Sequence, residues 1–262
     1  MSALAGDDYL NFCEGLRELS GIDLTQYKRP QMERRLRTFL ERRGFRRLMD
    51  AMPELRADRA ELDALLDRMT INVSQLWRNP EHWKLLETKI LPELGQKGRV
   101  TAWSAGSSYG AEAYTLGAIC RRAIPRATVQ IHGTDIDKRM VERAKRGLFS
   151  ADDARSAPKS EMERYFEQVP DGWQANQELR SMMRFELGDL LRIRPRRDTY
   201  DLILCRNTVI YFAEPIRDEL HARLAGALRP GGYLMVGATE RVADPKALEL
   251  TSAHPFIFRK NA

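Results

Sequence analysis

Short apolar segments alternate with helical segments over the second part of the chain, and this alternation restricts its fold more than any other feature. After Gly98 the first two apolar segments are RVTAWSAG and TVQIHGTDI, and a helical pattern over 110–123 separates them. Strands that alternate with helices form parallel sheets covered on both faces. We therefore predict a doubly wound α/β domain, completed by a closing antiparallel strand in HPFIFRK.

Before this domain, apolar residues recur at the spacing of a helix. The pattern is formed by Tyr9, Phe12, Leu16 and Leu19, and by Met32, Leu36, Phe39 and Leu40. We therefore expect a small all-helical domain with a linker helix over 1–80, and the α/β domain over 81–262. A polar stretch at about 150–184 interrupts the alternation and predicts a small inserted subdomain, in which SEMERYFEQ is expected to be helical.

Composition excludes several classes of protein. The chain has 262 residues, of which 43% are apolar, and this is enough for an ordinary core. It lacks a long apolar run and a signal-like leader, so we expect a cytoplasmic protein that does not insert into a membrane. The three cysteines and four histidines lack ligand spacing, which argues against a metal site.

Positive charge is concentrated in one segment. The formal net charge is +6, and residues 28–47, KRPQMERRLRTFLERRGFRR, hold most of the excess. Acidic protein surfaces, nucleic acids and anionic lipids are the partners that such a segment attracts. Arg34, Arg37 and Glu41 share a helix face, so part of this charge is also compatible with an ordinary solvated surface.

The turn WSAGSSYGAEAYTLG, residues 103–117, follows the first expected strand and begins a helix. It has neither the G-x-G-x-x-G pattern nor the Lys-Ser/Thr of a P-loop, so it does not match the common phosphate-binding turns. Its small residues allow a ligand to approach the backbone closely. We therefore expect it to hold a ligand without a phosphate.

Polar residues follow the successive strands, where the carboxyl ends of parallel strands form one crevice. They are Glu112, Asp135, Asp189, Arg206 and Asn207. Carboxylates repel a phosphate but attract a nucleoside with a cationic tail, which describes S-adenosylmethionine. Asp135 suits a ribose diol, and Asp189 suits an adenine amino group with Leu190 against the ring. NAD stays possible on Asp135 alone, and each acid taken singly is equally compatible with a turn or a helix cap.

Four motifs, in this order along the chain, carry a family resemblance. They are INVSQLWRN, WSAGSSYGAEAYTLG, GTDID followed by RAKRGLF, and YDLILCRNTVIYF. With these motifs the chain resembles the CheR-type chemoreceptor glutamate methyltransferases over nearly its whole length. The resemblance implies a Rossmann-like, S-adenosylmethionine-dependent methyltransferase domain behind an all-helical domain. It also implies methyl transfer to glutamate side chains of a chemoreceptor, giving methyl esters.

The resemblance further implies roles for individual residues. By position in the family's motifs, the cofactor site consists of Asn72, Ser74, Arg78, Glu112, Asp135, Asp189, Leu190, Arg206 and Asn207. Arg78 and Tyr211 correspond to the family's proposed active-site pair. Because a glutamate is ionised near neutral pH, it needs no general base to attack a sulfonium methyl group. We therefore expect Arg78 to position the carboxylate rather than to activate it.

The resemblance also gives the basic segment a partner. Receptor methylation helices are acidic, so we expect them to dock on Arg34, Arg35, Arg37, Arg42 and Arg43. In some members of this family the inserted subdomain docks a pentapeptide at the C-terminus of the receptor. Here the segment is short and lacks the glycine-rich loop of those members, so we expect an enzyme without such a pentapeptide tether. Tyr109, Ala111 and Ala113 replace the family's usual Thr, Glu and Pro. These replacements leave open a regulatory protein that binds the cofactor or its product, S-adenosylhomocysteine, without turnover. A second alternative is a methyltransferase that acts on nucleic acid or on a small molecule. Against nucleic acid, the sequence lacks a basic patch interleaved with aromatic residues.

Overall fold

A computed structural model describes residues 7–69 and 74–262. By their contacts these residues form two compact units. One contains 7–69 together with Tyr211–Ile216, and the other contains 74–210 together with Arg217–Ala262.

The first unit is helical, as the spacing of its apolar residues predicted. Its elements are α1 (Asp8–Ser20), η1 (Leu24–Gln26), α2 (Arg29–Glu41), η2 (Met49–Ala51), α3 (Met52–Ala57) and α4 (Arg59–Met69). Asp7 caps α1 by accepting the Tyr9 N–H at 3.0 Å. Asp58 accepts the N–H of Ala60 at 2.7 Å in the same way at the start of α4. Short polar side chains therefore determine where these helices begin.

The core of the helical unit consists of the apolar residues that the sequence pattern selected. Tyr9, Phe12, Leu16, Met32, Leu36, Phe39 and Leu40 are all buried, whereas Leu19 is only partly buried. A second segment of the chain joins this unit, because Phe212 forms an isolated antiparallel bridge with Tyr27. Their rings lie 4.9 Å apart, and the Ala213 N–H donates to the Gln26 carbonyl.

The second unit contains the expected α/β sheet. Its strands are β1 (Arg99–Ala105), β2 (Thr128–Asp135), β6 (Met183–Leu187), β7 (Tyr200–Cys205), β8 (Leu228–Val236), β9 (Leu250–His254) and β10 (Ile257–Lys260). The order across the sheet is β6-β2-β1-β7-β8-β10-β9. The first five strands of this order are parallel, and β10 is antiparallel to both β8 and β9. The closing antiparallel strand expected in HPFIFRK is therefore confirmed as β10.

The sheet reverses its strand order at β1, and its parallel strands end at one edge. Ala105 of β1 is opposite Thr134 of β2, and Ser104 is opposite Leu204 of β7. The chain runs from β1 outward through β2 to β6, and then returns to the other side of β1 as β7. This reversal point at the carboxyl edge is where open α/β sheets bind ligands.

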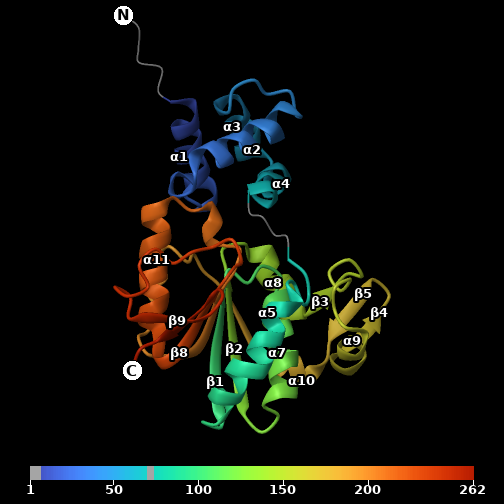
Figure 1. The fold of residues 1–262 in the computed structure, drawn as a ribbon. Helices are drawn as coiled ribbons and strands as arrows, with labels where there is room; N and C mark the ends of the chain where they lie inside the picture. The colour runs from blue at the N-terminus through green and yellow to red at the C-terminus, as the bar shows by residue number, and fades with distance from the viewer. Residues whose placement is uncertain (1–6, 70–73) are drawn as a thin grey trace, which may run out of the picture. The chain divides into compact units, whose positions relative to one another are not determined.

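Helices cover the sheet on both faces. The chain enters the sheet through α5 (Pro80–Leu85), a π-helical turn (Leu86–Ile90) and α6 (Leu91–Gly95). Helices α7 (Ala111–Ala123), α8 (Lys138–Arg146) and α10 (Gln177–Met182) lie on one face, and α11 (Glu214–Ala227) lies on the other (Figure 1). Most apolar side chains of β1 and β7 are fully buried as a result.

A small antiparallel sheet is inserted between α8 and α10. It has the order β3-β5-β4, with β3 at Leu148–Phe149, β4 at Phe166–Val169 and β5 at Gly172–Ala175, and α9 (Lys159–Tyr165) precedes β4 (Figure 1). The helix predicted over SEMERYFEQ is wrong in its last residues, because Phe166 begins β4 and pairs with Ala175. Burial of the Phe166 ring in the core favours the strand there.

Three further features of the described residues concern the cysteines, membrane spans and a buried histidine. Cys13, Cys120 and Cys205 are buried free thiols, as small apolar residues would be. Within 7–69 and 74–262, no helix is long and apolar enough to span a membrane. His221 on α11 is fully buried, and neither ring nitrogen has a hydrogen-bond partner among the described residues. Burial therefore lowers the pKa of His221 to about 4.

Because the His221 imidazole is buried, we expect part of the free energy of unfolding to depend on pH. Between about pH 4 and 6.5 the unfolded chain binds a proton that folded His221 does not, so stability falls as the pH falls through this window. The shift corresponds to about 3 kcal/mol of unfolding free energy. Replacing His221 by Leu should remove this dependence and leave stability at pH 7 equal or higher, because no hydrogen bond is lost.

Chemical unfolding of both proteins between pH 4 and 7 measures the effect. A His254→Leu variant, at a partly exposed position, controls for the removal of a histidine. An unchanged pH slope in His221→Leu would contradict the assignment.

Candidate functional site

The turn after β1 has a backbone that requires glycine. Gly106, Ser108 and Gly110 have positive φ angles of 80°, 47° and 88°. The N–H groups of Gly106 and Ser107 both donate to the Thr134 carbonyl at the end of β2, at 2.9 and 3.0 Å. A Cβ atom on Gly106 would lie 2.6 Å from the Thr208 hydroxyl. The turn therefore lies directly against the loop that follows β7.

Asp135 stabilises this turn from the end of β2. Its carboxylate accepts the Ser108 N–H at 2.7 Å and the Asp137 N–H at 3.0 Å. Burial raises the pKa of Asp135, although these two N–H groups act in the opposite direction. A carboxylate can accept about four hydrogen bonds, so Asp135 retains capacity for a ligand with hydroxyl groups.

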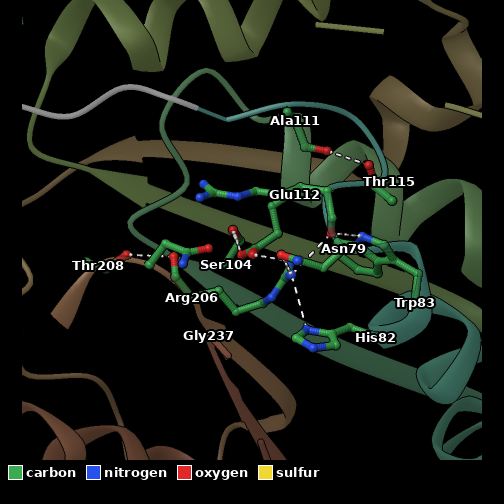
Figure 2. Close-up of polar contacts among 12 residues, drawn as sticks. Asn79, His82, Trp83, Ser104, Ala111, Glu112, Thr115, Arg206, Thr208 and Gly237 are labelled. Atoms are coloured by element: carbon green, nitrogen blue, oxygen red, sulfur yellow. Dashed lines mark hydrogen bonds and ion pairs between the residues drawn. The ribbon is translucent and has the colours of Figure 1, made fainter. Parts of the chain in front are cut away.

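Glu112, in the first turn of α7, forms a buried ion pair with Arg206. Its Oε2 lies 3.3 Å from Arg206 Nη1, and its Oε1 accepts a 2.7 Å hydrogen bond from Ser104 of β1 (Figure 2). The side chains of Arg206 and Glu112 are only 3% and 13% exposed. Burial raises the pKa of Glu112, and Arg206 and Ser104 oppose this rise. One carboxylate thus connects β1, α7 and the loop after β7.

The other edge of the Arg206 guanidinium contacts the start of α5. Its Nη2 donates to the Arg78 carbonyl at 3.2 Å. The same atom donates to Asn79 Oδ1 at 3.2 Å and lies 3.4 Å from His82 Nδ1 (Figure 2). A guanidinium only donates, so we infer that His82 accepts at Nδ1 and is neutral. Burial lowers the pKa of His82, and the charge of Arg206 lowers it further. The Trp83 ring lies 5.1 Å from the guanidinium carbon.

Tyr109, the bulky residue of the turn, points away from the strand ends. Its ring is 2% exposed and packs 6.2 Å from the Phe149 ring of the inserted subdomain. The Arg143 guanidinium covers it at 4.0 Å, and its hydroxyl donates to the Ser74 carbonyl. Tyr109 therefore attaches the segment before Arg78 to the turn and does not obstruct the crevice.

The remaining residues expected at the cofactor site are placed as follows. Asp189 follows β6 and caps the next turn by accepting the Leu191 N–H at 2.8 Å, and Leu190 is buried. Asn207 lies in the loop after β7 with a positive φ of 57°. Asn72 lies outside the described residues. The carboxyl edge therefore brings together residues from the loops after β1, β2, β6 and β7.

Tyr211 belongs to the helical unit. Its carbonyl accepts the Lys28 N–H at 2.8 Å, and the Arg35 guanidinium lies 5.5 Å from its ring. Arg78 belongs to the α/β unit. The pairing of Arg78 with Tyr211 therefore stays a prediction.

Several residues of this site were missed in the sequence. Ser104, Asn79, His82 and Trp83 contact the ion pair or its arginine, and Glu240 after β8 accepts backbone N–H groups of the loop after β7. Glu240 follows the buried strand β8, so its place at the carboxyl edge was detectable, but its backbone partners were not. His82 and Trp83 have no such signal, since an apolar helix face explains both.

Two buried polar atoms at this edge indicate what the site accommodates. Ser107 Oγ and Arg206 Nε have no hydrogen-bond partner among the described residues. These donors suit the carboxylate of an amino acid, while Glu112 suits its ammonium group and Asp135 suits a ribose. The residues present therefore fit S-adenosylmethionine, whose sulfonium supplies an electrophilic methyl group when bound.

The role of Glu112 can be tested with two ligands. Glu112→Gln should weaken S-adenosylhomocysteine binding about tenfold or more, because a charge-assisted hydrogen bond to the ligand ammonium is lost. Binding of 5′-methylthioadenosine, which lacks the amino-acid end, should weaken much less. In the original protein, affinity for the first ligand should also fall as the pH falls toward the raised pKa of Glu112, because the carboxylate becomes protonated.

Isothermal titration calorimetry with both ligands measures these affinities. Equal losses for the two ligands would assign Glu112 a general structural role instead.

The Tyr109 contact has a matched control in Tyr114. Tyr109→Phe removes the hydrogen bond to the Ser74 carbonyl and leaves the ring packing, so S-adenosylhomocysteine affinity should fall several-fold, for a bond of about 1 kcal/mol. Tyr114→Phe removes a comparable buried hydrogen bond, to the Ala144 carbonyl, away from that segment. Melting temperatures should fall similarly in both variants, but only Tyr109→Phe should lose affinity. Equal affinities would refute the role of Tyr109.

Comparisons with known proteins identify the family of the chain. The model of the CheR methyltransferase SAM-binding domain matches residues 72–257, and the model of the CheR all-alpha domain matches 7–70. A chemotaxis protein methyltransferase of Listeria innocua is 31% identical over 97% of both chains. Chemotaxis protein methyltransferase 1 of Pseudomonas aeruginosa is 30% identical over 98% of both chains. As its motifs predicted, the chain belongs to the CheR family of S-adenosylmethionine-dependent methyltransferases.

Proposed function

We propose that this methyltransferase esterifies glutamate side chains of a chemoreceptor. The observation that carries the proposal is the buried Glu112–Arg206 network at the carboxyl edge, in a chain similar over its length to chemotaxis protein methyltransferases. Beside this network, Ser107 Oγ and Arg206 Nε are the donors proposed for the amino-acid end of the cofactor. The methyl acceptor is a glutamate carboxylate, consistent with the positive charge of the chain.

The chemistry places modest demands on the protein. An acceptor carboxylate oxygen forms a bond to the methyl carbon, the carbon–sulfur bond breaks, and its electron pair stays on sulfur. A glutamate is already ionised near pH 7, so no side chain has to remove a proton. The residues of the site align the acceptor with the methyl group and exclude water.

Arg78 and Tyr211 complete the proposal as the residues nearest the acceptor. Arg78 holds the acceptor carboxylate, and Tyr211 hydrogen-bonds it or directs the methyl group. A cation in contact with the carboxylate also lowers its nucleophilicity, so Arg78 acts by positioning. Its location supports this role, because the Arg78 carbonyl is bound by Arg206 and Trp83.

The receptor is proposed to dock on a smaller part of the basic segment than its sequence suggested. Arg37 pairs with Glu33 at 2.7 Å, Arg43 pairs with Glu61 at 2.6 Å, and Arg35 stacks on Tyr211. Arg34 and Arg42 are exposed, and neither pairs with a residue of the described chain. These two arginines are therefore the proposed contacts for an acidic methylation helix, and no pentapeptide tether is required.

Radiolabelled methyl transfer onto isolated chemoreceptor tests this function. The protein should transfer label from methyl-labelled S-adenosylmethionine, and mild base should release it as methanol, because glutamyl esters hydrolyse there. Label that resists base, or label on nucleic acid, would exclude the proposed product. Arg78→Ala should transfer methyl groups much more slowly even when the cofactor is saturating.

Paired charge reversals test the docking surface in the same assay. Arg34→Glu with Arg42→Glu should raise the KM for receptor several-fold and leave cofactor affinity unchanged. Arg56→Glu with Arg59→Glu makes the same change in net charge in α3 and α4, where both arginines form exposed ion pairs. An equal rise in KM for both variants would show that only the overall charge matters.

A further inference from the structure

Glu240 is a buried acid whose carboxylate binds only backbone. It is 4% exposed and follows β8. Its Oε2 accepts the N–H groups of Asn207 and Gly237 at 2.8 and 2.6 Å. Its Oε1 accepts those of Val209 and Ile210 at 2.9 and 3.3 Å. One carboxylate thus satisfies four N–H groups from two loops that are distant in sequence.

Three of these N–H groups belong to the loop after β7, the segment that contains Arg206 and Asn207. This loop has left the sheet, so no strand neighbour satisfies its amides. Asn207 also adopts a left-handed backbone with φ of 57°, a conformation that needs support from its surroundings. The carboxylate of Glu240 supplies that support with charge-assisted hydrogen bonds, which are stronger than neutral ones.

The packing around Glu240 is close. A Cβ atom on Gly237 would lie 2.6 Å from Glu240 Oε2 and 2.9 Å from the Asn207 nitrogen. On its other side the same loop contacts the turn after β1, because a Cβ atom on Gly106 would meet the Thr208 hydroxyl. The loop is therefore confined between the turn after β1 and the turn at 237–240.

We propose that Glu240 is a positioning residue for the cofactor site. By fixing the backbone from Asn207 to Ile210, it sets the position from which Arg206 reaches Glu112 and the amino-acid end of S-adenosylmethionine. On the side of Glu240 that carries its own turn, a cavity of about 340 Å³ is lined also by Arg241 and Phe256. The inference rests on the cofactor site and not on the identity of the methyl acceptor.

The role requires a group that only accepts hydrogen bonds. Glutamine has nearly the same shape, but its Nε2 would face two N–H donors, so two of the four hydrogen bonds would be replaced by repulsion. Aspartate keeps the charge, but its side chain is one methylene shorter and would not reach all four N–H groups. Glu240→Gln should therefore loosen the loop while the sheet stays folded.

Hydrogen exchange and ligand binding test the proposal on the full chain. In Glu240→Gln, amide exchange over residues 205–210 should accelerate about tenfold or more, and the Kd for S-adenosylhomocysteine should rise by a similar factor. Exchange in β1 and β2 should not change. Gly237→Ala, which displaces the carboxylate sterically, should reproduce both effects, and it replaces Glu240→Gln if that variant fails to fold.

Val100→Ala is the control for a general loss of stability. Val100 is fully buried at the start of β1, at the opposite end of the strand from the site. When its melting temperature falls as much as in the Glu240 and Gly237 variants, Val100→Ala should leave amide exchange over 205–210 unchanged. Its Kd for S-adenosylhomocysteine should also be unchanged. If the Glu240 or Gly237 variant matches Val100→Ala in both measurements, the proposal is wrong. Loss of methyl transfer with unchanged exchange and Kd would likewise overturn it. Neither readout requires a receptor, so a wrong acceptor would not affect the result.

Discussion

The buried ion pair between Glu112 and Arg206 is the interaction on which the rest of the site depends. Removing two charges from water is costly, and the cost is recovered only when both are fully hydrogen-bonded. Here Ser104 binds the carboxylate, the Arg78 carbonyl and Asn79 bind Nη2 of the guanidinium, and its Nε remains for the ligand. The pair therefore fixes β1, α7, the start of α5 and the loop after β7 in one arrangement, and removal of either partner would leave an uncompensated charge.

Much of this arrangement was predictable because parallel strands end at one edge. That rule, applied to polar residues after apolar segments, correctly brought the loops of Glu112, Asp135 and Arg206 together. The ion pair itself was not predictable, because the sequence does not give the distance between side chains that share this edge. Glu240 was missed because its partners are backbone N–H groups, which leave no residue-type signature. The end of the helix before β4 was missed because pairing with β5 overrode local propensity.

Tyr109 shows why a motif alone cannot give the direction of a side chain. Tyr109 places a large ring, where the family usually has threonine, at a turn that a ligand can approach closely. Burial against Phe149 and the hydrogen bond to the Ser74 carbonyl direct the ring toward the inserted subdomain instead. The substitution therefore does not favour a protein without turnover, and it adds a contact to the segment that leads to Arg78.

The helical unit is discontinuous in sequence, since Tyr211–Ile216 belongs to it although these residues follow β7. The backbone of this segment pairs with Gln26 and Lys28, and Phe212 packs on Tyr27. A fragment that ends before the sheet would lack these partners, and a fragment that begins at the sheet would expose them. The two units are therefore poor candidates for separate expression or for exchange between relatives, unless residues 211–216 are transferred with the helices they complete.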